Sequence, residues 1–193
     1  MTARRIGLFG GSFDPVHAGH LILAQTAYEE LSLDRLYFLP AAQSPFKPDR
    51  QPSPSAARLR LLRMALAGQP AFEIDDQEIH RGGLSFTIDT AQDYGRRFPS
   101  AELFYLIGAD HVQLLPKWRS ASDLARLLTF VIVPRPGATP TPLPAPFRSK
   151  WLHGFSVGIS SSLIRERIRG GLSIDYLVPP GVAEAIRLDS MYS

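Results

Sequence analysis

Cysteine is absent from the 193-residue sequence. Its absence excludes disulfide bonds, thiolate-bound metals and cysteine nucleophiles, and it fits a reducing compartment. The sequence also lacks any run of about 20 consecutive apolar residues, the length that a transmembrane helix needs. At the N-terminus, the apolar run in MTARRIGLFGG is too short for a secretory signal. We therefore expect a cytoplasmic protein that makes no contact with a membrane.

Positively charged residues outnumber negatively charged ones only slightly. The formal net charge is +3 at pH 7, although the sequence pI is about 9.4. This balance permits binding to nucleic acid but does not require it, and a solvated surface rich in arginine explains it as well. We expect no nucleic-acid partner, whereas a small anionic ligand could use the same charges locally. The composition is compatible with a monomer and with a homo-oligomer.

Apolar residues are plentiful by contrast, at 45% of the chain, and the length suits one domain over residues 1–193. Short apolar runs rich in β-formers alternate with segments of helical periodicity. The expected strands are 4–9, 35–39, 102–107 and 128–133, and the expected helices include 19–32 and 55–67. This alternation predicts an α/β fold with a mostly parallel sheet flanked by helices. A small helical part is expected at about 158–193.

Two proline-rich segments interrupt the alternation. Residues 40–54 hold five prolines and residues 134–146 hold six, so neither segment can form regular structure. Each follows the carboxyl end of an expected strand, which is where open α/β sheets bind ligands. We interpret 134–146 as a surface loop, whereas 40–54 contains Lys47 and is a candidate part of a site. Ser55, directly after it, is expected to cap helix 55–67.

The stretch FGGSFDPVHAGH (9–20) combines a glycine pair, a turn and two histidines. Gly10 and Gly11 end the first strand and would let ligand phosphates approach the backbone N–H groups. The chain then turns at Asp14 and enters a helix near Gly19, whose positive dipole end favours anions. The spacing matches neither GxGxxG nor GxxxxGK[ST], so the dinucleotide-binding and P-loop interpretations both fail. The stretch predicts a phosphate site of another kind.

His17 and His20 are three residues apart at this helix start, so their rings can share one face. A metal pair is one interpretation, but HxxH lacks the HExxH spacing and a third ligand nearby. A structural alternative is a helix cap in which one ring is buried in a hydrogen bond. Two rings beside a glycine turn favour contact with an anion, to which each ring can donate. We therefore predict phosphate binding and no protein-held metal.

A second candidate phosphate site is GISSSLIRERI (158–168). Ser160 and Ser161 would offer hydroxyls and free backbone N–H groups at the start of a helix. Arg165, four residues after Ser161, could reach an anion held there. The alternative is an ordinary capped helix with a solvated arginine. In both cases two isoleucines of the stretch, Ile164 and Ile168, would anchor the helix to the core.

Together, G-G-x-F-D-P-x-H-x-G-H at 10–20 and ISSxxIR at 159–165 resemble the signatures of the nucleotidylyltransferase superfamily, and most of all those of bacterial nicotinate-mononucleotide adenylyltransferases. The resemblance implies a Rossmann-like fold and the transfer of AMP from ATP to nicotinate mononucleotide, which yields nicotinate adenine dinucleotide and pyrophosphate. It implies Mg²⁺ as the ion that assists ATP. The catalytic positions that it implies are His17, His20, Lys47 and Arg165. The ATP-binding positions that it implies are Gly10, Gly11, Ser12, Phe13, Gly108, Asp110, Ile159, Ser160, Ser161 and Arg165.

SFTIDT (85–90) resembles the S-x-T-x-D-T element of the same family. The substrate-binding positions that the resemblance implies are Ser85, Phe86, Thr87 and Trp118. In the family, backbone N–H groups near Thr87 would receive the nicotinate carboxylate, and Trp118 would stack on the pyridine ring. From the residues alone, Ser85 could instead cap a helix that runs to Arg97, and Trp118 could fill the core.

Two positions depart from the family pattern. Phe46 replaces the histidine that usually precedes Lys47, which removes a second donor, and Ser12 replaces a threonine but keeps the hydroxyl. Asp110 could accept from ribose hydroxyls or could simply cap a helix. The remaining histidines are expected to be structural or exposed: His80, His111 and His153.

Two other functions stay open. A related transferase could use phosphopantetheine or a cytidine nucleotide, but SFTIDT and Trp118 argue against it. A non-catalytic nucleotide sensor or nucleic-acid binder is the alternative from another class of protein. The presence of His17, His20, Lys47 and Arg165 argues against that alternative.

Overall fold

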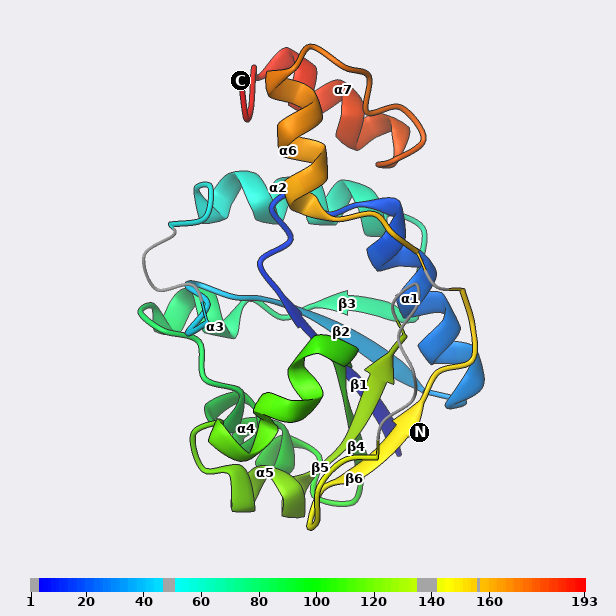
Figure 1. The fold of residues 1–193 in the computed structure, drawn as a ribbon, viewed down its shortest axis with the longest axis vertical. Helices are drawn as coiled ribbons and strands as arrows, with labels where there is room; N and C mark the ends of the chain where they lie inside the picture. The colour runs from blue at the N-terminus through cyan, green and yellow to red at the C-terminus, as the bar shows by residue number, and fades with distance from the viewer. Residues whose placement is uncertain (1–3, 47–50, 135–141, 156) are drawn as a thin grey trace.

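The computed structural model describes residues 4–46, 51–134, 142–155 and 157–193. At its centre is a six-stranded sheet in the order β3-β2-β1-β4-β5-β6, and every neighbouring pair of strands is parallel (Figure 1). The strands are β1 (Arg5–Gly11), β2 (Arg35–Pro40), β3 (Phe72–Ile74), β4 (Glu102–Gly108), β5 (Leu128–Val133) and β6 (Arg148–Trp151). The predicted parallel sheet is confirmed, and so are the four strands expected from apolar runs.

The two edge strands, β3 and β6, were not expected from the sequence. β3 has three residues, and β6 has four residues that are largely exposed. Neither presents the apolar run by which a buried parallel strand is recognised. Their pairing with β2 and β5 depends on the neighbours that the fold brings to them.

Helices cover both faces of the sheet (Figure 1). On one face, α1 (Ala18–Glu30) and α2 (Ser55–Leu66) contribute to a core cluster that includes Phe38 and Phe104. On the other face, α4 (Thr87–Arg97), the 3-10 helix η1 (Ala109–Lys117) and α5 (Ala121–Leu127) contribute to a second cluster that includes Tyr37 and Tyr105. Neighbouring residues of β2 and β4 thus point to opposite cores, as the two-residue period of a strand requires.

The C-terminal helices α6 (Ser161–Arg169) and α7 (Pro180–Leu188) lie beyond one end of the sheet, at the top of Figure 1. Ile164 of α6 is fully buried in the first core cluster and Ile168 packs against it, as the sequence predicts. Val182 and Ile186 of α7 belong to the same cluster. The expected helical part at 158–193 is therefore present, while a single domain over 1–193 stays a prediction.

Two expected helix caps are wrong. α2 begins at Ser55 itself, after Pro54, so the Ser55 hydroxyl does not cap it. α4 begins at Thr87 with Phe86 in the cap position, and the Ser85 hydroxyl instead accepts from the Ala42 N–H at 2.9 Å. In both places the serine lies at or near the start of a helix, but at Ser85 the hydroxyl and the N–H are engaged by the loop after β2, since the Ser85 N–H donates to the Gln43 carbonyl at 2.9 Å. None of the helices within the described ranges has both the length and the apolar character of a membrane span.

Candidate active site

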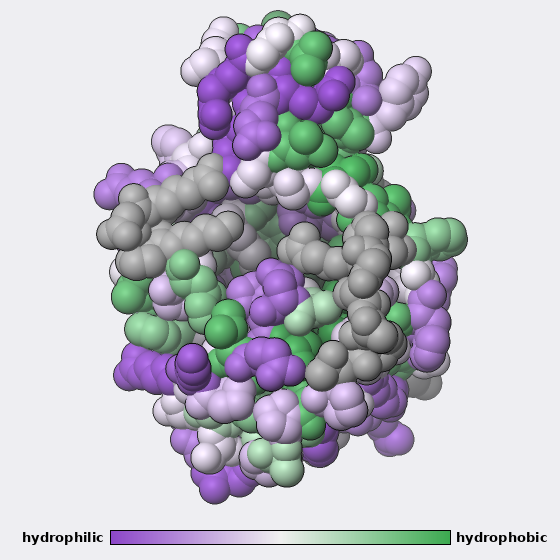
Figure 2. All heavy atoms as spheres, in the orientation of Figure 1, coloured by the Kyte–Doolittle hydropathy of each residue, from purple (hydrophilic) through white to green (hydrophobic). Residues whose placement is uncertain are grey.

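The strand order reverses between β1 and β4, because the chain continues from β1 to β2 on one side and from β4 to β5 on the other. In open α/β sheets, the carboxyl ends of the strands at such a point form a crevice for ligands. A pocket of about 410 Å³ lies there, beside Gly10 and Gly11 of β1 and Gly108 of β4. The space-filling view is hollowed near its centre, below the C-terminal helices (Figure 2). Topology thus places the glycine-rich ends of two strands around one cavity.

Motifs that are far apart in the sequence meet in this pocket. The predicted residues in its wall are Gly10, Gly11, Ser12, Phe13, His17, His20, Ser85, Thr87, Gly108, Trp118, Ile159, Ser160, Ser161 and Arg165. Phe86 and Asp110 are outside the wall. The Phe86 ring packs against the second core cluster, and the Asp110 carboxylate is about half exposed beside His111. Lys47 lies outside the described residues. The binding roles of these three stay predictions.

His17 and His20 cap the first turn of α1 reciprocally. The His20 N–H donates to His17 Nδ1 at 3.3 Å, and the His17 N–H donates to His20 Nδ1 at 3.2 Å. The two rings are stacked, with their centroids 3.6 Å apart. Because each Nδ1 accepts a hydrogen bond, each neutral ring carries its proton on Nε2. The helix-cap interpretation is therefore correct, and it leaves one Nε2–H donor per ring for an anion.

Burial keeps both rings neutral. It lowers the pKa of His17 to about 4, and burial together with the neighbouring His17 holds the pKa of His20 well below its usual value. The His20 ring lies against Phe13 and Phe9, at centroid distances of 4.9 and 5.8 Å. Gly19 leaves room for the His17 ring, since a Cβ there would lie 3.0 Å from Nδ1. The motif therefore supplies two neutral donors.

The glycine pair is required by the protein's own packing as well as by any ligand. A Cβ on Gly10 would overlap the Tyr105 hydroxyl, and a Cβ on Gly11 would lie 3.1 Å from the Phe13 ring. Both glycines also line the pocket, so their backbone N–H groups are near the cavity. The sequence interpretation, which assigned the pair to phosphate approach alone, missed the contact with Tyr105.

The turn after the glycine pair is held by two buried arginines. Phe13 adopts φ 47°, a left-handed conformation that is unusual for a bulky residue. Arg165, which is only 6% exposed, donates to the Asp14 carbonyl. Arg58, which is 1% exposed, donates to the Ser12 carbonyl at 2.7 Å. The interpretation of Arg165 as a solvated side chain is therefore wrong.

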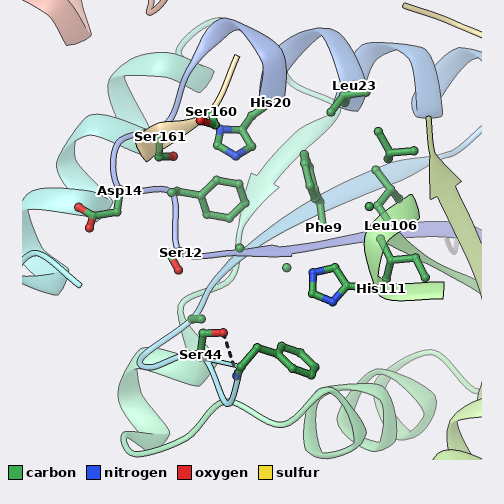
Figure 3. Close-up of a pocket in the computed structure, with 18 of the residues that line it drawn as sticks. Phe9, Ser12, Asp14, His20, Leu23, Ser44, Leu106, His111, Ser160 and Ser161 are labelled. Atoms are coloured by element: carbon green, nitrogen blue, oxygen red, sulfur yellow. Dashed lines mark hydrogen bonds between the residues drawn. The ribbon is translucent and has the colours of Figure 1, made fainter. Parts of the chain in front are cut away.

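The start of α6 also contacts this turn. Ser160 caps α6 by accepting from the Leu163 N–H at 3.2 Å, and the Ser161 hydroxyl donates to the Pro15 carbonyl at 2.9 Å. Figure 3 shows Ser160 and Ser161 on the same side of the pocket as His20. The N-termini of α1 and α6 thus converge on the turn, and both helix dipoles favour an anion between them.

An aromatic group forms another part of the wall. Trp118 lies against Phe46 with a centroid distance of 5.4 Å, and its ring meets Tyr105 edge-on at 6.3 Å. Thr87, the first residue of α4, donates to the Tyr105 hydroxyl at 3.3 Å. His111 also contacts Phe46 and Trp118, at 5.1 and 6.2 Å. Planar apolar surface beside a helix start suits an aromatic ring that carries a charge.

A buried carboxylate, also in the pocket wall, lies next to this aromatic group. Glu78, which lies on α3 (Gln77–Arg81), accepts from the Thr90 hydroxyl at 2.7 Å, and Arg81 donates to the same hydroxyl at 3.0 Å. Burial raises the pKa of Glu78, while hydrogen bonds from Thr90 and Ser85 oppose that shift. Because Ser85 also holds the Ala42 N–H, Glu78 connects α3, the start of α4 and the loop after β2.

Sequence reasoning missed several wall residues: Asp14, Phe46, Glu78, Tyr105 and His111. Asp14 is within the first motif, but its type suggested only a turn. Glu78 and Tyr105 belong to segments that resemble ordinary surface helix and buried strand, so no local signal marks them. His111 follows a recognised element and could have been found from its position at the end of β4.

The chain is similar in sequence to proteins of a known family. The family model described as cytidylyltransferase-like matches residues 8–167. The chain belongs to this family. A protein of Opitutus terrae named probable nicotinate-nucleotide adenylyltransferase is 42% identical, over 97% of this chain and 97% of its own length. One of Geobacillus kaustophilus with the same name is also 42% identical, over 97% of this chain and 86% of its own. Within the cytidylyltransferase-like family, the chain therefore groups with the nicotinate-nucleotide adenylyltransferases.

Solved structures agree in fold. A Plasmodium falciparum nicotinic acid mononucleotide adenylyltransferase complexed with NaAD has a TM-score of 0.81 at 17% identity, with 98% of this chain and 97% of that one covered. A putative nicotinate-nucleotide adenylyltransferase of Vibrio parahaemolyticus has a TM-score of 0.70 at 18% identity, with 98% and 95% covered. The predicted Rossmann-like nucleotidylyltransferase fold is confirmed.

Proposed function

We propose that this family member transfers AMP from ATP to nicotinate mononucleotide and releases pyrophosphate, a step of NAD biosynthesis. The observation that carries the proposal is the convergence of two helix N-termini and two neutral histidine donors on one turn, opposite an aromatic wall. The first group suits phosphates, and the second suits a pyridine ring. The relatives with this name, which match nearly the whole chain, support the same reaction.

The chemistry is an in-line displacement at the α-phosphorus of ATP. A 5′-phosphate oxygen of the nucleotide forms a bond to this phosphorus, while the bond to the bridging oxygen of pyrophosphate breaks. The attacking phosphate is already an anion at pH 7, so no side chain has to remove a proton. Catalysis then consists of positioning and of charge stabilisation.

Side chains in different parts of the site are proposed to stabilise different phosphates. His17 and His20, both neutral, donate from Nε2 to the reacting phosphates, and these hydrogen bonds strengthen as negative charge grows on the phosphate oxygens. Arg165 holds the turn through the Asp14 carbonyl and adds its positive charge to the triphosphate side. Lys47 is proposed to act on the same phosphates, although it lies outside the described residues.

Mg²⁺ is proposed to arrive with ATP. Over the described residues, no group of three or more histidine, aspartate or glutamate side chains could hold a metal ion. Mg²⁺ usually binds phosphate oxygens and keeps several waters rather than occupying an all-protein cage. When bound, the ion would neutralise charge on the leaving pyrophosphate. Asp14 is a carboxylate of the pocket wall, in the turn that the two helix N-termini approach.

The acceptor end is proposed to lie at the aromatic wall. The first turn of α4 begins at Thr87 without a side-chain cap, so its N–H groups can receive the nicotinate carboxylate. Trp118 offers a face for the pyridine ring. A cytoplasmic location is proposed as well, since the absence of cysteine fits a reducing compartment. The absence of a nucleic-acid partner and the oligomeric state stay predictions.

The product that receives an isotope label from each phosphorus of ATP tests the reaction directly. With ATP labelled at the α-phosphorus, we expect the label in a dinucleotide when nicotinate mononucleotide and Mg²⁺ are present. With ATP labelled at the γ-phosphorus, we expect the label in pyrophosphate. Label from the γ-position in the acceptor, or release of labelled inorganic phosphate alone, would replace AMP transfer by phosphoryl transfer or hydrolysis.

A further inference from the structure

The end of the chain returns to the turn between β1 and α1. After α7, the Tyr192 hydroxyl donates to Asp14 Oδ1 at 2.9 Å, across 178 positions of sequence. The Met191 N–H donates to the Ile186 carbonyl, and both Met191 and Tyr192 pack against the first core cluster. Burial raises the pKa of the Tyr192 hydroxyl, which keeps it a donor at every working pH.

The backbone of this segment is held in an unfavourable conformation. Tyr192 has φ 71°, in the left-handed region that residues other than glycine rarely adopt. Such conformations persist where surrounding contacts fix them, and they occur often at functional positions. Phe13, next to the acceptor Asp14, is left-handed as well. The hydrogen bond thus connects two unusual backbone positions.

The acceptor lies where it can influence the phosphate side. Asp14 is 6% exposed and is in the pocket wall, where Figure 3 shows it on the far side of the turn from His20. Its Oδ2 accepts from the Ser53 N–H at 3.3 Å, so Tyr192 supplies the contact to the other oxygen. Phe13, the residue before it, packs on the His20 ring at 4.9 Å. Asp14 is thus connected to His20 through one neighbour in the chain, Phe13.

We propose that Tyr192 is a positioning residue for AMP transfer: its hydroxyl fixes Asp14, and through the turn it fixes the rings of His17 and His20 against the reacting phosphates. This role rests on the proposed function. The hydrogen bond is proposed to set the position of donors to the reacting phosphates, whereas the aromatic wall proposed to hold the acceptor lies elsewhere in the pocket. Its loss should therefore lower kcat more than it raises KM.

Tyr192→Phe removes only the hydroxyl, and Tyr176→Phe is the matched control because Tyr176 is 96% exposed. We expect kcat to fall about tenfold in Tyr192→Phe, since small misplacements of catalytic groups cost up to about a hundredfold. The KM values for ATP and nicotinate mononucleotide should stay within about twofold. Tyr176→Phe should match the parent protein. An unchanged kcat in Tyr192→Phe, or a loss confined to KM, would overturn the proposal.

A double-mutant cycle tests whether the effect of Tyr192→Phe on kcat depends on Asp14. In an Asp14→Ala background, the further change Tyr192→Phe should cost kcat less than about twofold, because coupled residues are non-additive. A full additional tenfold loss would contradict the proposal. The ring resonances of His17 and His20 give a readout that needs no turnover. They should shift in Tyr192→Phe and not in Tyr176→Phe, and unshifted rings would overturn the positioning role even if the proposed reaction itself failed.

Discussion

At His17, helix capping and burial act on the same ring. The Nδ1 atom accepts from the backbone of His20, and burial lowers the ring's pKa to about 4. A cationic histidine would bind phosphate more strongly in the ground state, but it could not accept that backbone hydrogen bond. The arrangement favours a neutral donor whose interaction strengthens as charge develops during the reaction.

The depressed pKa has a consequence for stability. An unfolded histidine titrates near about 6.5, so below that pH the unfolded chain binds a proton that folded His17 refuses until about pH 4. The contribution of His17 to the free energy of unfolding is therefore fully present above about pH 6.5. As the pH falls toward 4, this contribution decreases by up to about 3 kcal/mol. Urea unfolding at pH 7.5 and 4.5 measures it, and His17→Gln should lose less stability between these values than the parent. Parallel losses would contradict the assignment.

At the level of single residues, the sequence predicted which side chains meet and missed how they bond. The string from Gly10 to His20 identifies its histidines through its resemblance to the family signature, and two rings beside a glycine turn favour contact with an anion. The reciprocal cap was not predicted, since it depends on ring rotamers and on Phe9 and Phe13 from outside the helix. Arg165 likewise was assigned to a ligand, whereas its first partner is the Asp14 carbonyl.

Among the elements, the contact between β1 and β4 sets the floor of the site. Gly10→Ala should lower the free energy of unfolding by about 2 kcal/mol, because its Cβ would overlap the Tyr105 hydroxyl. Adding Tyr105→Phe should recover about 1 kcal/mol of this loss, since it removes the overlapping oxygen. Thermal and urea unfolding of both single variants and the double variant measure the coupling. Simple additivity would show that the hydroxyl is not the obstacle.

Glu78 joins three elements around the aromatic wall. Glu78→Ala should destabilise the protein by about 3 kcal/mol, because the Thr90 and Ser85 hydroxyls would lose a buried acceptor and Arg81 would lose a nearby opposite charge. Glu73→Ala is the matched control, since that carboxylate is 44% exposed and its ion pair with Arg35 should contribute less than about 1 kcal/mol. Denaturant unfolding compares them, and equal losses in the two variants would argue against a connecting role for Glu78.

The sequence predicted elements where burial leaves a pattern. β1, β2, β4 and β5 are mostly apolar in their interiors because helices cover both of their faces. β3 and β6 carry no such pattern, being short edge strands. The start of α2 at Ser55 agrees with the expected helix 55–67, but the caps expected from Ser55 and Ser85 are wrong. The Ser85 hydroxyl accepts from the distant Ala42 N–H instead of from its own helix.

For the whole molecule, the parallel sheet explains why the functional groups gather at one edge, since all of its strands end there. The carboxyl ends of β1 and β4 bring the first motif and the aromatic wall together, and the C-terminal helices close the phosphate side. Alternation of strand and helix predicts this architecture from sequence. The contact of Tyr192 with Asp14 could not be predicted, since nothing local in either segment specifies a partner 178 positions away.

The acceptor specificity of the purified protein tests the central claim most directly. Pyrophosphate release from Mg²⁺-ATP would be compared with nicotinate mononucleotide, nicotinamide mononucleotide and phosphopantetheine at equal concentration. We expect a strong preference for the nicotinate nucleotide, because the start of α4 offers N–H donors to a carboxylate. Equal use of both pyridine nucleotides would contradict the assignment of carboxylate binding to α4. No release with any acceptor would contradict adenylyl transfer itself.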